Sequence, residues 1–255
     1  MAIIALKAWY IEQYEPLKEI IKKPHTIRLS RNSLLKSALR VDILDDRTIV
    51  EASDWFSRYL TGETVEFYIE GSGNYIVSNV DLVSQEIYFT KKEVLATLDP
   101  VIYYSPQGSN GEITQATTAI VEQTVAKLSM RSRIPLSLEI TPRPQDSPLR
   151  LSDSQLRKIR KSLLFIADAT PIASIPGENN TSLILDSNVC VEIGYAIHSK
   201  DNGQILLLKM EKPDLAGKLP FDVSGYKQLN YSTTSELQKT LPKLTQALLQ
   251  KFNLF

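Results

Sequence analysis

The chain has 255 residues, more than one simple domain usually holds, and we expect two modest domains rather than one large one. Its 29 basic and 29 acidic residues balance, and residues 1–96 carry 12 Lys and Arg against 14 Asp and Glu, which argues against duplex DNA as a partner. No apolar run approaches the roughly 18 residues of a membrane helix and no signal-peptide pattern opens the chain, so we expect a cytoplasmic protein without a membrane partner.

Residues 1–96 are predicted to form a small α+β domain. The stretch LKAWYI predicts a strand, and EPLKEIIKK, RNSLLKSALR and VEASDWFSRYL predict helices. Three strands follow in VEFYIEG, NYIVSNVDL and QEIYFTK, with GSG as the turn between the first two. The candidate core residues of these strands are Phe67, Ile69, Ile76, Val80, Ile87 and Phe89.

Aromatic residues are frequent in these three strands, namely Phe67, Tyr68, Tyr75, Tyr88 and Phe89. If the sheet is covered on one face only, some of them face outward and offer a surface to a protein partner. Ordinary strand composition explains them as well, because aromatic residues are common in strands. Both interpretations stay open at this point.

Residues 97–255 are predicted to alternate strands and helices. The strands are DPVIYYSP, IPLSLEITP, LLFIADAT, QILLLKM and YKQLNY, and the helices are GEITQATTAIVEQTVAKL, SDSQLRKIRKSL, NVCVEIGYAIHSK and LPKLTQALLQKF. The stretch PIASIPGENNTSLIL is predicted to be a loop, and TPRPQDSP a stiff surface connection. Such alternation is typical of a parallel sheet covered by helices.

In an open parallel sheet the ligand crevice lies beyond the carboxyl ends of the strands. The loop at 103–112 follows the first strand and could face a phosphate at the start of a helix, or it is a solvated turn. Asp168 ends an apolar strand, where a carboxylate suits a ribose hydroxyl, although aspartate also commonly bonds its own turn.

Glu192 stands inside an otherwise apolar helical stretch, DSNVCVEIGYAIH. Helical spacing places it on one face with Asn188, Tyr195 and Ala196, while Val189, Ile193 and Ile197 form the face that packs on the sheet. Its carboxylate is therefore predicted to point toward the crevice. The alternative is a solvated acid in the first turns, which the helix dipole favours.

Metal chemistry is not expected. Cys190 is the single cysteine, and His25 and His198 are the only histidines, so no zinc-ligand spacing exists anywhere in the chain. A divalent ion held by carboxylates alone stays open. One cysteine also excludes an intramolecular disulfide.

Four stretches in order, IADAT, SNVCVEIGYAIH, ILLLKME and LPFDVSGYKQLNY, resemble the TIR-like nucleotide-binding domains of bacterial defence proteins and the related nucleoside 2-deoxyribosyltransferase-like group. The matching positions are Asp168, residues 188–196 and residues 220–222. The resemblance covers roughly residues 99–255 and implies a flavodoxin-like (TIR-like) parallel sheet with helices on both faces for the domain at 97–255.

The resemblance implies that Glu192 is catalytic and that the domain cleaves the N-glycosidic bond of NAD or a related nucleotide. NAD is then a substrate, and no cofactor is needed. Asp168 and Asn188 would hold ribose hydroxyls, and the 103–110 loop, with Ser105, would meet the diphosphate. The other expected substrate-binding residues are Tyr103 and Tyr195, either of which would stack on a base, and Asp222.

The domain at 1–96 is then expected to regulate the enzyme or to bind a protein partner, and the protein is expected to be a homo-oligomer. Two other readings stay open beside this one. The first is a non-catalytic module that senses a nucleotide or assembles with itself. The second is a nucleoside deoxyribosyltransferase.

Overall fold

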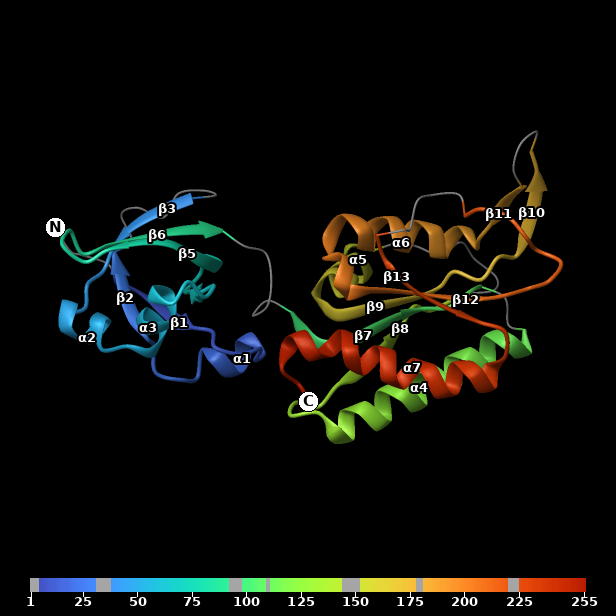
Figure 1. The fold of residues 1–255 in the computed structure, drawn as a ribbon, viewed down its shortest axis with the longest axis horizontal. Coiled ribbons are helices and arrows are strands. Elements are labelled where there is room, and N and C mark those ends of the chain that lie inside the picture. The colour runs from blue at the N-terminus through green and yellow to red at the C-terminus, as the bar shows by residue number, and fades with distance from the viewer. Residues whose placement is uncertain are drawn as a thin grey trace. The chain divides into compact units, whose positions relative to one another are not determined.

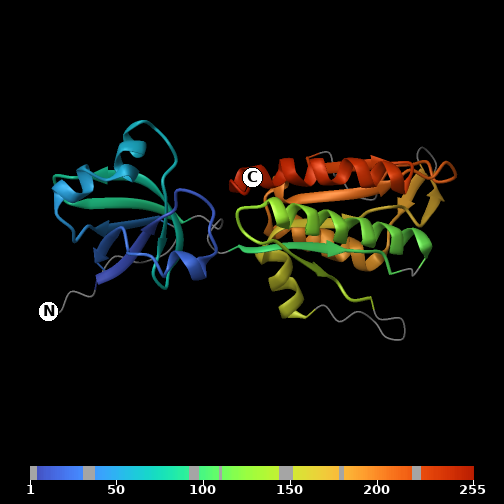
Figure 2. The same ribbon diagram turned by 90° about the horizontal axis from the view of Figure 1, so that it is seen from below.

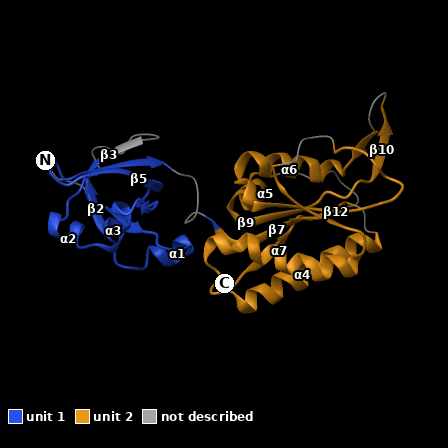
Figure 3. Ribbon diagram, viewed as in Figure 1, with its two compact units in different colours: residues 1–98 blue, residues 99–255 orange. Residues whose placement is uncertain are grey.

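The computed structural model of the chain describes residues 5–30, 38–91, 98–108, 111–143, 152–177, 181–219 and 225–255. Two compact units form, residues 1–98 and residues 99–255 (Figure 3). Each unit has its own sheet and its own buried core, so each is described by itself.

Unit 1 is built on a six-stranded antiparallel sheet. Its strands are β1 (Ala5–Tyr10), β2 (Ile27–Ser30), β3 (Ala38–Asp42), β4 (Glu66–Ile69), β5 (Gly73–Asp81) and β6 (Glu86–Lys91), in the spatial order β2-β1-β4-β5-β6-β3. Three short helices accompany it: α1 (Leu17–Ile20), α2 (Arg47–Glu51) and α3 (Asp54–Leu60). An antiparallel bridge between Leu29 and Ile43 links the two edges, so the sheet is nearly a barrel.

Two sequence predictions for unit 1 need correction. The end of RNSLLKSALR is strand rather than helix: β3 pairs with β6, which buries Val41 opposite Ile87, while residues 31–37 lie outside the described residues. In β5 the register shifts between Val77 and Asn79, so Tyr75 and Val77 are buried whereas Ile76 is only half-buried. A bulge of this kind moves side chains from one face to the other, and strict alternation misses it.

The aromatic residues of unit 1 divide between core and surface. Phe67, Tyr75 and Phe89 are buried and contact one another or Trp55 through edge-to-face ring pairs. Tyr68 and Tyr88 are half-buried. Most of the aromatic enrichment in these strands therefore serves packing.

Unit 2 is a mixed α/β fold around a five-stranded parallel sheet. Its strands are β7 (Asp99–Ser105), β8 (Ser137–Ile140), β9 (Ser162–Asp168), β12 (Ile205–Met210) and β13 (Lys227–Tyr231), in the spatial order β13-β12-β9-β7-β8. If the five strands are numbered 1 to 5 in chain order, from β7 to β13, their spatial order is 2-1-3-4-5, which is the flavodoxin-like order. The predicted parallel sheet is confirmed, and its central strand β9 is buried over its whole length.

Four helices cover the two faces of this sheet. Helices α4 (Glu112–Arg131) and α7 (Thr234–Leu249) pack side by side on one face, and α5 (Asp153–Lys161) and α6 (Ser187–Ser199) pack on the other (Figures 1 and 2). Two 3₁₀ turns complete the unit, at Asn202–Gln204 and Gln250–Phe252. Within the part of the chain that the structure describes, no helix has both the length and the apolar character needed to span a membrane.

The stretch between β9 and α6 differs from the loop that the sequence predicts. It forms an antiparallel hairpin of β10 (Ala173–Pro176) and β11 (Thr181–Ile184), which projects from the unit (Figure 1). The strands β10 and β11 are only four residues long, and Pro176 ends β10. Short strands with little burial leave a weak sequence signal.

A buried lysine marks the amino-terminal edge of the sheet. Lys200 is 9% exposed, and its Nζ donates to the carbonyl oxygen of Ser162 at 2.5 Å. Burial, and then the positive charge of Lys251, lower the pKa of Lys200 to about 7, and Asp201 opposes this shift. An unfolded lysine keeps its proton up to about pH 10.4. Unfolding therefore takes up a proton between about pH 7 and pH 10.

We predict that the free energy of unfolding rises with pH through this window, by up to about 1.4 kcal/mol per pH unit from this one group. Replacing Lys200 with Met removes the titrating group, so the free energy of unfolding should depend less steeply on pH in the variant. Urea unfolding at pH 7 and pH 9.5 measures the difference for the wild type and for Lys200→Met. Equal pH dependence in the two proteins would contradict the assignment to Lys200.

Candidate functional site

The strand order places the crevice of unit 2 at the carboxyl ends of β7, β8 and β9. From β7 the chain passes to β8 on one side and afterwards to β9 on the other side, and ligands bind where the order reverses in this way. The residues at these three strand ends are Ser105, Thr141 and Asp168. Ser105 and Asp168 are among the predicted site residues, whereas Thr141 is not.

Glu192 lies in α6 and faces the sheet instead of solvent. Asp186 caps α6, since its Oδ1 accepts from the backbone N–H groups of Asn188 and Val189 at 2.9 and 3.3 Å. Glu192 therefore stands in the second turn, beside the buried residues Val189 and Ile193, and is 0% exposed. The solvated-acid reading of Glu192 is wrong, because a fully buried carboxylate needs partners.

Three polar side chains surround the Glu192 carboxylate. Arg143 forms a bidentate ion pair with it, Nη1 to Oε1 at 3.1 Å and Nη2 to Oε2 at 2.8 Å, and the two side chains are 8% and 1% exposed. Ser105 Oγ donates to Oε2, and Thr141 Oγ1 approaches the same oxygen at 3.4 Å. The negative charge is thus balanced by one guanidinium, and hydroxyls complete the shell.

Tyr103 extends this cluster into the core. Its phenolic oxygen accepts a hydrogen bond from Thr141 Oγ1 at 3.0 Å, and its ring stacks on Phe165. Burial raises the pKa of Tyr103, and the side chain is 2% exposed. The predicted stacking of Tyr103 on a base does not fit this position, because the side chain is buried in the core against Phe165 and leaves no exposed ring face for a ligand.

Asp168 lies on the other face of the sheet from Glu192. Ser105, which contacts Glu192, pairs in register with Ala167, so these two side chains lie on the Glu192 face of the sheet. Successive side chains of a strand point to opposite faces, and Asp168 therefore points toward α4 and α7. Its Oδ1 accepts from the backbone N–H of Thr170 at 3.1 Å. Asp168 therefore bonds its own turn, as in the alternative to ribose binding that the sequence left open. Burial raises the pKa of Asp168, which is 2% exposed.

The remaining predicted residues are not brought to Glu192 by any described contact. Asn188 is half-buried in the first turn of α6, where its backbone N–H belongs to the Asp186 cap. Tyr195 is half-buried and packs against the core between the sheet and α5 and α6. Asp222, together with the rest of the predicted 220–222 motif, lies outside the described residues.

A cavity of about 360 Å³ opens beside the Glu192 cluster. It lies between the β7–α4 loop, the first turns of α4 and the residues after β8, and it is lined by Pro106, Gln107, Thr114, Gln115, Thr118, Ala119, Glu122, Thr141 and Arg143. Arg143 and Thr141 belong both to this lining and to the shell of Glu192. Glu192 itself does not line the cavity.

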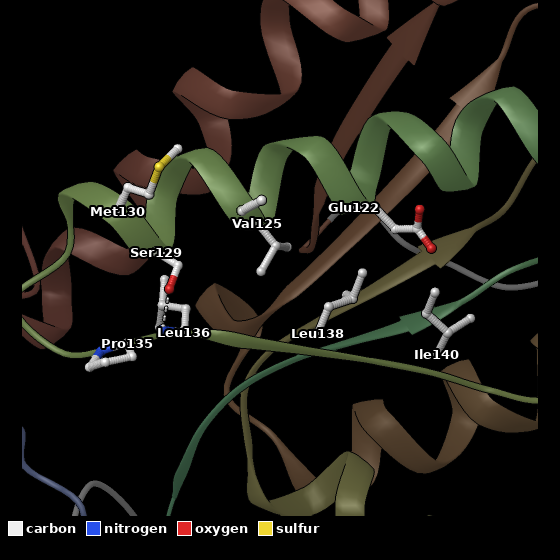
Figure 4. A pocket seen from close by; sticks show the side chains of 9 residues that line it. Glu122, Val125, Ser129, Met130, Pro135, Leu136, Leu138 and Ile140 are labelled. Carbon is white, nitrogen blue, oxygen red and sulfur yellow. Dashed lines mark hydrogen bonds between the residues drawn. The ribbon is translucent and has the colours of Figure 1, made fainter.

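A second, larger groove of about 660 Å³ lies between α4 and the edge strand β8. Figure 4 shows Val125, Leu138 and Ile140 facing this space, with Glu122 at one end. Apart from Glu122, its lining is almost wholly apolar, and none of the predicted site residues belongs to it. Glu122 is the one charged side chain in this lining and Ser129 the one hydroxyl, so the groove lacks a cluster of polar groups like the one around Glu192.

The β7–α4 loop is tied to the other elements of the crevice. Asp186 Oδ2 accepts from the backbone N–H of Gly108 at 2.8 Å, and Gln107 Nε2 donates to the carbonyl oxygen of Thr170 at 2.6 Å. A Cβ atom at Gly108 would meet Asp186 Oδ2 at 3.0 Å. One carboxylate therefore caps α6 and holds the loop that borders the cavity.

We predict that Asp186→Ala destabilises unit 2 by about 1 kcal/mol through the lost cap and also frees the loop. Asp186→Asn is the matched variant. Its one side-chain oxygen can still cap α6, but its NH₂ group replaces Oδ2 and cannot accept from the N–H of Gly108. Hydrogen exchange of the Gly108 amide should therefore speed up in both variants, with stability falling mainly in Asp186→Ala. Unchanged Gly108 exchange would contradict the proposed tie.

The sequence prediction missed Arg143 and Thr141. Both follow β8 at the carboxyl end, which is the same signal that selected Asp168 after β9. TPRPQDSP was instead interpreted as a surface connection, and this is wrong for Arg143, whose side chain is 8% exposed. Among the residues that the structure describes, no group of three or more His, Cys, Asp or Glu side chains could hold a metal ion.

Comparisons with known proteins give similarity at the level of the fold. Neither a family model nor a curated protein sequence matches the chain. A flavodoxin-like domain from Synechococcus sp matches 59% of this chain and 99% of its own at 11% identity and a TM-score of 0.35. A CMP N-glycosidase from Clostridium botulinum matches 55% and 96% at 18% identity and a TM-score of 0.31. These values are too low to assign an activity.

Proposed function

We propose that unit 2 binds a nucleotide at the carboxyl edge of its sheet and cleaves the N-glycosidic bond of NAD or a related nucleotide, with Glu192 as the catalytic carboxylate. The observation that carries the proposal is the setting of Glu192, a fully buried acid held by Ser105, Thr141 and Arg143 where the strand order reverses. The resemblance of residues 188–196 to the TIR-like motif supports the same assignment.

The chemistry needs few groups. When the bond between C1′ of the ribose and the base nitrogen breaks, the electron pair leaves with the base and positive charge develops on the sugar. A carboxylate beside C1′ stabilises that charge or attacks the carbon, and water then completes the hydrolysis. Nicotinamide leaves NAD as a neutral base, so a separate acid to protonate the leaving group is not required.

The cavity beside the cluster supplies a place for the rest of the nucleotide. It borders the start of the 20-residue helix α4, and a helix N-terminus favours phosphate. Gln107, Thr114 and Thr118 add polar side chains to the lining, Arg143 adds a positive charge at the end toward Glu192, and Glu122 adds a negative charge from α4. In this proposal the phosphate lies toward α4 and the ribose lies toward Glu192.

A second function is favoured by one specific observation. Glu192 is 0% exposed and is paired with Arg143 through both carboxylate oxygens, which also suits a structural ion pair in a protein that binds a nucleotide without cleaving it. In that case unit 2 senses a nucleotide or assembles with other copies. Unit 1 serves as the regulatory or partner-binding part of the chain in either function.

The two functions are separated by measuring base release and binding on the same samples. The full chain, over a wide range of protein concentration, is incubated with NAD or with CMP, and free nicotinamide or cytosine is quantified by chromatography. Release of a base in proportion to protein supports the glycosidase, and a steep concentration dependence adds self-assembly. Saturable binding of a nucleotide with no released base supports the sensing function instead.

A further inference from the structure

The guanidinium of Arg143 is almost fully occupied by the protein itself. Nε donates to the carbonyl oxygen of Pro106 at 2.9 Å, and Nη2 donates to Ser105 Oγ at 3.0 Å. The remaining two bonds go to the Glu192 carboxylate. Four of the five N–H donors of the fork therefore have partners in this state.

The same guanidinium belongs to the wall of the cavity. Arg143 and Thr141 line the space of about 360 Å³ beside α4, whereas Glu192 does not reach it. Arg143 consequently stands between the cavity and the carboxylate. While the pair is closed, a carboxylate that is 0% exposed cannot touch a ribose bound in the cavity.

Phosphate and carboxylate compete for the same donor geometry. Arginine binds both with two parallel N–H···O bonds, and a phosphate carries more negative charge than a carboxylate. A phosphate group in the cavity would therefore draw the guanidinium toward itself, and Ser105 and Thr141 would remain with Glu192.

We infer that Arg143 is a positioning residue that couples phosphate binding to the release of Glu192, so that the site acts on phosphorylated nucleotides and leaves nucleosides untouched. This inference rests on the proposed function and deepens it by naming the substrate class. A ligand without a phosphate leaves the Arg143–Glu192 pair closed and the carboxylate covered. The pair is then the resting state of the site.

The coupling is reciprocal, as any coupling of two binding equilibria must be. If phosphate has to displace the Glu192 carboxylate from Arg143, then removing the charge of Glu192 makes phosphate binding tighter. This consequence is opposite to what a simple loss of a site residue would produce. It is also independent of whether any bond is cleaved.

The test uses inorganic phosphate and inorganic pyrophosphate, with calorimetric titration of the full chain. The proteins are the wild type, Glu192→Gln, Arg143→Lys and Glu139→Gln. Glu139 is a glutamate of β8 that pairs with Lys158 at 3.0 Å, so its variant controls for the loss of one nearby negative charge. Arg143→Lys keeps the charge but loses the fork, which avoids an unpaired buried carboxylate.

We expect Glu192→Gln to bind pyrophosphate about tenfold more tightly than the wild type, within the usual range of coupling between sites. Arg143→Lys should bind several-fold more weakly, and Glu139→Gln should match the wild type. Equal affinity in Glu192→Gln and the wild type, or an equal gain in Glu139→Gln, would overturn the inference.

Pyrophosphate affinity tests this inference, whereas base release tests the proposed function, so the two can fail independently. Tighter binding in Glu192→Gln without any base release by the wild type would leave the coupling intact and remove the glycosidase. Base release by the wild type with unchanged affinity in Glu192→Gln would keep the glycosidase and remove the coupling. A further check compares NMN with nicotinamide riboside, and equal cleavage of the two would count against the phosphate requirement.

Discussion

Replacing Arg143 with Met is expected to lower the free energy of unfolding of unit 2 by about 3–5 kcal/mol, because it leaves the Glu192 carboxylate buried without its counter-charge. The loss should be much larger than the volume change of the side chain alone would cause. Urea unfolding followed by circular dichroism measures it. Arg143 and Glu192 both belong to unit 2, so a transition that shifts in Arg143→Met and also in Glu192→Gln is assigned to that unit.

Two further variants show whether charge is the cause. Arg143→Met combined with Glu192→Met replaces the whole pair by apolar side chains, and it should recover most of the lost stability. Lys158→Met breaks the ion pair with Glu139, whose side chains are 51% and 34% exposed, and should cost less than about 1 kcal/mol. If the double variant were as unstable as the single one, the ion pair would not explain the effect.

Replacing Glu192 with Gln is expected to reduce the release of nicotinamide from NAD by about a thousandfold or more, as removal of a central catalytic group does. Glutamine keeps the size of the side chain and can still accept from Ser105, but it carries no negative charge to stabilise the cation that forms on the ribose. Initial rates at saturating NAD measure the change in kcat.

Glu139→Gln is the matched control for this variant, since it changes another glutamate of unit 2, in β8, whose side chain pairs with the exposed Lys158. It should retain the wild-type rate. Binding of a nucleotide to Glu192→Gln should persist, which shows that the site has not collapsed. Wild-type turnover in Glu192→Gln would rule out Glu192 as the catalytic group.

The local spacing of apolar residues is enough to predict most helices and strands of unit 2. The continuous apolar run from Leu163 to Ala167 predicts a central strand, and β9 is buried throughout. The helix of residues 188–200 follows from its spacing, and in the structure Asp186 caps it. By contrast, β3 and the β10–β11 hairpin depend on pairing with distant residues or on short strands, and no local period marks them.

The site was predictable only in part, because its decisive contact is tertiary. Glu192 is identified by a motif, whereas Arg143 lies 49 positions away between two prolines and is typical of a surface loop in sequence. Asp168 and Glu192 both fall at the crevice edge, yet the alternation of side chains along β9 sends Asp168 to the opposite face. Which face a strand-end residue occupies follows only when the register between strands is known.

We propose that unit 2 cleaves the N-glycosidic bond of a nucleotide through Glu192. The most direct measurement incubates NAD with the full chain in ¹⁸O-labelled water, beside a sample of Glu192→Gln, and identifies the products by mass spectrometry. We expect nicotinamide and ADP-ribose with one solvent oxygen at C1′ from the wild type, and intact NAD from Glu192→Gln. Intact NAD in both samples at every protein concentration, or the same products from both, would contradict it.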